Sequence, residues 1–140
     1  MKGLETLIRV NSWTLDEKRR QLADLEDLRA GFYREIAHFE EQLILNQAAA
    51  ATSPEIAQTY GHYAVTVIER RRVLRQSIEE AQEAVNAATD EAHHAYQEVK
   101  KYETALERAK ERQRKEEDRV AQIELDEMGL NMFRRNNPQN

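Results

Sequence analysis

The chain is poor in the residues that build compact globular domains. Its 140 residues include no Cys, two Pro, four Gly and only 6% aromatic side chains. The absence of Cys excludes a disulfide scaffold and a Cys-based zinc site. No apolar run approaches the ~20 residues that span a bilayer, and Arg9 and Asn11 interrupt any N-terminal signal segment. We therefore expect a soluble, cytoplasmic protein without a large globular core.

Charge is abundant but evenly mixed in the C-terminal third. Charged residues make up 34% of the chain, and the formal net charge is −5. Residues 51–99 carry 4 basic and 8 acidic side chains, whereas residues 100–140 carry 10 basic and 9 acidic ones. A nucleic-acid-binding surface needs a basic excess on one face, so we expect no nucleic-acid partner. Such a charged composition with little Gly and Pro is typical of long helices.

A heptad ladder runs through the second half of the chain, with spacings that alternate between four and three residues. Its members are Tyr60, Ala64, Val67, Arg71, Leu74, Ile78, Ala81, Val85, Ala88, Ala92, Ala95, Val99, Tyr102, Leu106, Ala109, Gln113, Glu116, Val120, Ile123, Glu127 and Leu130. A seven-residue repeat of this length predicts a helix that supercoils against a partner helix. This regular spacing also argues against a disordered chain.

A shorter ladder of the same kind lies in the first half. Its members are Leu4, Ile8, Asn11, Leu15, Lys18, Leu22, Leu25, Arg29, Phe32, Ile36, Phe39, Leu43 and Asn46. Thr52 and Glu55 have capping-box spacing, and Pro54 suits a first helical turn. We predict helix one at about 3–47, a bend at about 48–53, helix two at about 54–133 and a disordered tail at 134–140. The fold class is all-α: a single antiparallel coiled-coil hairpin with a C-terminal helical overhang.

A bend centred near residue 50 sets the predicted register, in which facing residue numbers add up to about 100. Bulky residues of helix one then face the alanine-rich stretch Ala81–Ala95, and Arg29 faces Arg71. These two arginines are expected to extend toward neighbouring carboxylates, although a site for an acidic partner is an alternative. Predicted facing pairs also include Phe39 with Tyr60 and Ala64, Leu22 with Ile78, Leu15 with Val85, and Ile8 with Ala92.

Helix two is longer than helix one, so its end is expected to lack an internal partner. In the predicted register residues 97–133 project alone and expose a stripe that starts with Val99, Tyr102, Leu106 and Ala109. An exposed apolar stripe of this length marks a binding surface. The bend also has apolar residues beyond the seam, Ile44, Leu45, Ile56, Tyr63 and Val65, which either pack locally or form a docking patch. Trp13 lies off the seam and is either a surface residue or a partner contact.

No set of residues predicts catalysis or cofactor binding. The chain has no glycine-rich phosphate loop, which argues against nucleotide hydrolysis. Asp90 and His94 lie one helical turn apart, but two ligands do not make a metal site, and acid–histidine pairs are common on helix surfaces. We therefore expect a protein that is not an enzyme and that holds neither metal nor cofactor.

Three features together resemble the flagellar type III export protein FliJ family and, more distantly, the injectisome stalk protein YscO. They are the unequal antiparallel arms, the Tyr60, Tyr63, Val67 start of helix two, and the Glu124-Leu125-Asp126-Glu127 stretch before Arg134 and Arg135. The resemblance covers essentially the whole chain.

The resemblance implies a stalk similar to that of rotary ATPases. The overhang would enter the pore of the export ATPase hexamer FliI, through Val120, Ile123, Leu125, Asp126, Glu127 and Leu130. The hairpin region would contact the export gate protein FlhA, through Gln42, Asn46, Tyr63, Val67 and Arg70. Export chaperones are further implied partners, and the protein would sit at the cytoplasmic face of the membrane-embedded export apparatus.

Two other classes of protein fit parts of the pattern. A self-assembling coiled-coil scaffold would pair its overhangs between chains, so it would oligomerise alone, whereas a stalk would be monomeric alone. A prefoldin-like chaperone arm needs a β-rich oligomerisation segment, and the sequence has no strand pattern.

Overall fold

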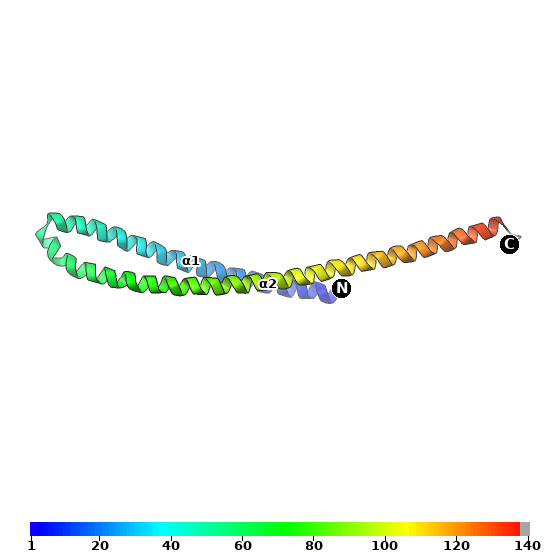
Figure 1. The fold of residues 1–140 in the computed structure, drawn as a ribbon, viewed down its shortest axis with the longest axis horizontal. Coiled ribbons are helices and arrows are strands. Elements are labelled where there is room, and N and C mark those ends of the chain that lie inside the picture. Colours follow the sequence, from blue (N-terminus) through cyan, green and yellow to red (C-terminus); the bar gives the residue numbers. More distant parts are fainter. Residues whose placement is uncertain (138–140) are drawn as a thin grey trace. The chain divides into compact units, whose positions relative to one another are not determined.

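The computed structural model describes residues 1–137 and consists of two long helices (Figure 1). Helix α1 spans Lys2–Thr52 and helix α2 spans Pro54–Asn136. No strand occurs within the described range. The predicted all-α class with two long helices is therefore confirmed.

The bend between the helices is much tighter than the predicted 48–53 segment. Ser53 is the one residue between α1 and α2 that is not helical. The alanine run 48–51 stays in α1 because Ala has the highest helix propensity. The helix ends only before Pro54, since a following proline disfavours helical dihedrals.

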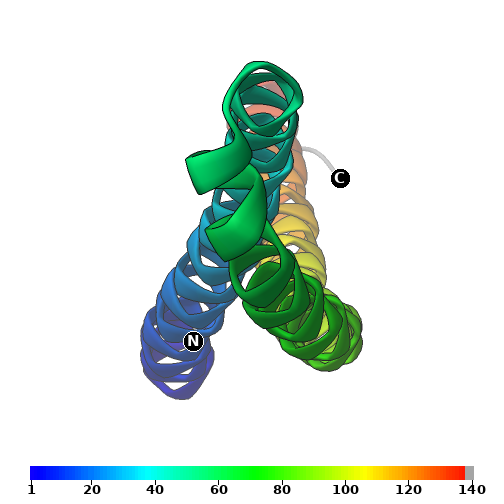
Figure 2. The ribbon, with the colours of Figure 1, turned by 90° about the vertical axis from the view of Figure 1, so that its left-hand side faces the viewer.

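The start of α2 is capped by Ser53 and not by the predicted Thr52. The backbone N–H of Ile56 donates to the hydroxyl oxygen of Ser53 at 3.5 Å. Thr52 instead donates its hydroxyl to the carbonyl oxygen of Ala49 at 3.0 Å, within α1. Pro54 then takes the first helical position, where its missing N–H leaves no helical bond unmade. Figure 2 looks onto this bend.

The other end of α2 extends past the predicted boundary of residue 133. Arg134 and Arg135 lie in its last turn, where positive charge is favourable beside the C-terminal end of the helix dipole. The remaining positions of the predicted disordered tail, 138–140, lie outside the described residues.

The chain divides into two compact units. One is Trp13–Tyr96, which we call the hairpin unit, and the other combines Met1–Ser12 with Gln97–Asn140, which we call the terminal unit. In the hairpin unit the two helices run side by side in opposite directions (Figure 1), and three ion pairs link them.

The two predicted ladders form the core. The buried apolar residues are Leu15, Val67, Leu74, Ala81, Val85, Ala88, Ala92, Ala95 and Val99. Every one of them is a ladder position, and the other ladder residues up to Ala109 are partly buried. Leu74 is only 1% exposed and is the most deeply buried large side chain of the described range. The heptad period therefore identified the seam correctly.

The predicted register of the seam is wrong by about two helical turns, because the residue numbers of the four pairs that cross it add up to 105–111 and not to about 100. Lys18 was expected opposite residue 82, but its ammonium group lies 3.1 Å from the carboxylate of Glu91. Arg29 was expected opposite Arg71, but it donates a hydrogen bond to the side-chain oxygen of Gln82 at 2.8 Å. The cause is the position of the bend, because moving its centre by one residue shifts each facing partner by two.

The corrected register separates the two arginines that were expected in one layer. Arg71 reaches Glu40 across the seam, with 3.7 Å between the guanidinium nitrogen and the carboxylate oxygen. The other predicted facing pairs, which placed Phe39 near Tyr60 and Leu15 near Val85, are displaced by the same amount. Large-against-small packing persists in the new register. One surface hollow of the hairpin unit is lined by Leu25, Leu28, Phe32, Ser77, Glu80, Ala81 and Ala84.

Candidate functional site

The last part of α2 is a helix whose described side chains are all exposed. In the terminal unit, Val99 is 5% exposed, and Tyr102, Leu106 and Ala109 are partly buried. Every residue from Arg112 to Asn137 is exposed. The unpartnered stretch therefore starts at 112, and not at the predicted 97, because the bend lies later than expected. We call residues 112–137 the exposed segment.

The exposed segment has large apolar side chains near its end. They are Val120, Ile123, Leu125, Met128, Leu130, Met132 and Phe133, with exposed fractions from 42% to 60%. Surface apolar residues are common singly, but a group of this size on one helix marks an interaction site. No contact within the described residues covers them.

These apolar residues lie on more than one face of the helix. At 3.6 residues per turn, Val120, Ile123 and Leu130 continue the seam. The other group, Leu125, Met128 and Met132, follows a spacing of three and four residues and lies on roughly the opposite face. A partner that covers only one side, as in a two-stranded coiled coil, would leave one group in water.

The segment between the seam and this apolar end is held helical by ion pairs. Arg114 lies 2.6 Å from Glu111, and Arg119 makes two hydrogen bonds to the carboxylate of Glu116 at 2.6 and 3.0 Å. The hydrogen bonds from Arg119 lower the pKa of Glu116, and Glu116 in turn raises the pKa of Arg119. Pairs at this spacing each stabilise an exposed helix slightly.

The acidic residues of the sequence prediction lie among the apolar ones. Asp126 accepts a hydrogen bond from the side-chain amide of Gln122 at 3.0 Å, while Glu127 occupies the seam-equivalent position between Ile123 and Leu130. All six residues predicted to contact the ATPase ring therefore lie on one exposed stretch of α2.

The five residues predicted to contact the export gate lie in the hairpin unit, but they differ in accessibility. Val67 is 3% exposed and belongs to the core. Asn46 is also a seam residue, and its side-chain amide donates to the carbonyl oxygen of Gln42 at 2.7 Å. Tyr63 is partly buried, and Arg70 is ion-paired with Glu35 at 2.9 Å.

Three of these five residues flank the seam on the same side. Gln42 directly precedes the seam residue Leu43, and Tyr63 and Arg70 hold the same place before their own seam residues on α2. In an antiparallel coiled coil such positions face each other across one edge, as the Glu35–Arg70 pair shows. We call Glu35, Gln42, Tyr63 and Arg70 the Arg70 edge.

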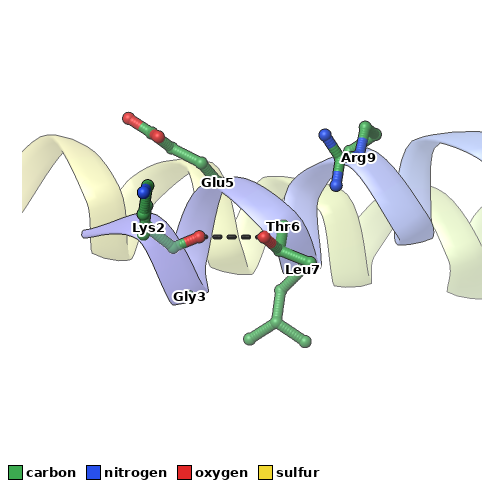
Figure 3. A pocket seen from close by; sticks show the side chains of 6 residues that line it. All are labelled: Lys2, Gly3, Glu5, Thr6, Leu7 and Arg9. Atoms are coloured by element: carbon green, nitrogen blue, oxygen red, sulfur yellow. Dashed lines mark hydrogen bonds between the residues drawn. The ribbon is translucent and has the colours of Figure 1, made fainter.

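A hollow at the start of α1 is a weaker candidate (Figure 3). It is lined by Lys2, Gly3, Glu5, Thr6, Leu7 and Arg9. All six residues belong to the first turns of one helix. The hydroxyl of Thr6 already donates a hydrogen bond to the carbonyl oxygen of Lys2 at 3.0 Å. Its charges are mixed and exposed, so it lacks the convergent polar groups that recognise a small ligand.

Metal-ligand clusters and membrane-spanning helices are both absent from the described residues. Within residues 1–137, no three His, Asp or Glu side chains gather as metal ligands. No helix in this range is both long and apolar enough to cross a bilayer.

Trp13 is 63% exposed. Sequence reasoning noted Ile44 and Val65 but missed Ile68, although Val65 and Ile68 have the three-residue spacing of one helix face.

The chain matches a model of a known protein family. The family model described as flagellar FliJ protein matches residues 1–138. No curated protein and no solved structure gives a significant match.

Proposed function

Because the chain belongs to the flagellar FliJ protein family and is thus a coiled-coil protein associated with flagellar export, we propose that it is the central stalk of the export ATPase. It acts in the cytoplasm, without catalysis or cofactor of its own. The exposed segment enters the ring of the ATPase FliI, and the Arg70 edge faces the export gate protein FlhA. Export chaperones are further partners of the same apparatus.

The observation that carries this proposal is the distribution of apolar residues on the exposed segment. A helix with apolar side chains on opposite faces buries all of them only where partners cover it from several sides. The pore of a ring offers such an environment, whereas pairing with a single second helix does not. This distribution therefore favours the stalk over the self-assembling scaffold.

The experiment is light scattering after size exclusion of the full chain, alone and with the export ATPase and nucleotide. A stalk is monomeric alone and joins the ATPase at about one copy per six subunits. The double variant V120D/I123D should lose this association, because charged carboxylates would be placed in an apolar contact. It should unfold at the same temperature as the parent chain, because both side chains are already more than 40% exposed.

A matched control is the double variant I44D/V65D, which changes two exposed apolar residues of the hairpin unit. It should retain its association with the ATPase ring. A stable homo-oligomer of the unmodified chain, with no ATPase association, would instead favour the scaffold.

The gate contact has a separate test. In this contact Gln42, Tyr63 and Arg70 face the gate protein, while Val67 and Asn46 support them from the seam. R70E should weaken binding to the cytoplasmic part of FlhA, since it reverses one charge of the edge and opposes Glu35. Binding of R70E to the ATPase ring should not change.

A further inference from the structure

The hairpin unit has a second edge on the other side of its seam. On α1, residues 33, 37, 40 and 44 follow spacings of four, three and four, so they form one stripe. On α2, residues 65, 68, 72 and 75 form the matching stripe. Glu40 reaches Arg71 from this side of the seam. We call the following residues the Glu40 edge: Tyr33, Ala37, Glu40, Ile44, Val65, Ile68, Arg72 and Arg75.

The corrected register brings the apolar members of the two stripes to the same level. Since Glu40 pairs with Arg71 and Arg29 with Gln82, Ile44 lies level with Val65, and Glu40 with Ile68. Ile44 and Val65 are 69% and 68% exposed, the highest values among the large apolar side chains of the described residues. Ile68 is 58% exposed beside them. Three exposed branched apolar side chains therefore lie on the same side of the seam at similar levels.

The charges of this edge leave one cation free. Glu40 is engaged by Arg71, and Arg72 is held by Glu69 at 2.7 Å. Arg75, two turns beyond Ile68 on the same stripe, makes no ion pair or hydrogen bond within residues 1–137. The edge therefore combines an apolar end with an unpaired guanidinium at the other end.

The apolar area of this cluster decides between two kinds of partner, a second copy of the chain and a single helix of another protein. Three exposed branched side chains offer on the order of 200–300 Å² of apolar surface. A stable dimer buries about 800 Å² on each partner, so a second copy would not be held by this edge. Two parallel stripes of side chains on neighbouring helices are instead the surface that a third helix covers.

We propose that the Glu40 edge docks an amphipathic helix of another protein. The apolar face of that helix covers Ile44, Val65 and Ile68, and one carboxylate about two turns away pairs with Arg75. This edge lies across the seam from the Arg70 edge, so the helix and the gate would not compete for the same side chains. The inference does not rest on the stalk proposal.

The test measures fluorescence anisotropy of a labelled synthetic helix with the full-length chain. The helix has about three heptads with Leu on one face and a single Glu two turns from its central Leu. A matched helix has Lys in place of Glu. The Glu helix should bind about threefold to fivefold tighter than the Lys helix, and R75Q should remove this difference.

The variant V65D should weaken binding of the Glu helix by more than about tenfold, because a carboxylate would be buried against Leu. Its circular dichroism should be unchanged, since the side chain is exposed. The control L7D changes an exposed apolar residue of the terminal unit and should bind like the unmodified chain.

Several outcomes would overturn the inference. One is no binding of either synthetic helix, and another is equal binding to V65D or equal binding of the Glu and Lys helices. Loss of binding in Y63D but not in V65D would place the helix on the Arg70 edge. A homodimer that V65D dissociates in light scattering would mean that a second copy covers the Glu40 edge.

Discussion

The guanidinium of Arg29 donates a hydrogen bond to the side-chain oxygen of Gln82 at 2.8 Å, and this contact fixes how α1 and α2 align in the hairpin unit. The Lys18–Glu91 pair is consistent with it, although it lies three turns away along α1. The Arg29 contact is part-buried, whereas the Lys18 contact is exposed. The alignment is therefore supported by two separate contacts and not by one surface ion pair.

This alignment predicts the outcome of chemical cross-linking. The chain has no Cys, so engineered cysteines are the only thiols. The variant K18C/E91C should be cross-linked efficiently by a short bis-maleimide reagent. The control K18C/Q82C matches a bend centred near residue 50 and should react poorly, because its cysteines lie about two and a half turns apart along the axis. Faster cross-linking of the control would contradict the register.

Arg71 is expected to be a site where an apolar residue stabilises the fold. Its Nε is buried and has no hydrogen-bond partner within the described residues, and its contact with Glu40 is long at 3.7 Å. Replacing a poorly satisfied charge in a seam with an apolar residue is often stabilising. R71L should therefore raise the free energy of unfolding by about 1 kcal/mol, as measured by urea denaturation.

The neighbouring seam residue Leu74 provides the control for R71L. L74A should lower the free energy of unfolding by about 2–5 kcal/mol, because it leaves a cavity at the most deeply buried large side chain. The interpretation of Arg71 would be wrong if R71L also destabilised the chain, since Glu40 remains half-exposed and solvated without its partner.

Glu116 is expected to titrate at a lower pH than an ordinary glutamate. The hydrogen bonds and positive charge of Arg119 lower the pKa of Glu116. A lowered pKa stabilises the folded helix at pH values above the ordinary pKa of Glu, and this stabilisation is lost as the pH falls through the lowered pKa. The carboxyl carbon resonance of Glu116 should report this midpoint, and R119Q should move it upward. An unchanged midpoint in R119Q would show that the pair does not persist in solution.

The helices and their seam could be predicted from the sequence because the heptad repeat determines which side of a helix is buried. All eight buried residues of α2 are ladder positions. The register could not be predicted in the same way. A shift of seven residues places seam residues opposite seam residues again, so the pattern fits several alignments almost equally well. The choice depended on the alanine run 48–51, whose helical state ends only at Pro54.

The candidate surfaces were predictable to different degrees. The apolar residues near the end of α2 are exposed as expected, because α1 is shorter than α2 and does not cover them. Val67 shows the limit of the sequence interpretation, since one residue was assigned both to the seam and to a partner contact, and the structure buries it. The Glu40 edge could not be predicted without the register, because Ile44 and Val65 come to the same level only in the correct alignment.

Because Ser53 is the only non-helical residue between α1 and α2, the position of the bend sets the length of the exposed segment. With no loop to absorb an insertion, a residue added to α1 alone would rotate its later side chains by about 100° and misplace the seam. Removing one whole heptad from α1 would keep the faces aligned and would free seven more residues of α2, about 10 Å of reach. Changes in the length of α1 are therefore expected to occur in steps of seven, each with a matching change in the length of the exposed segment.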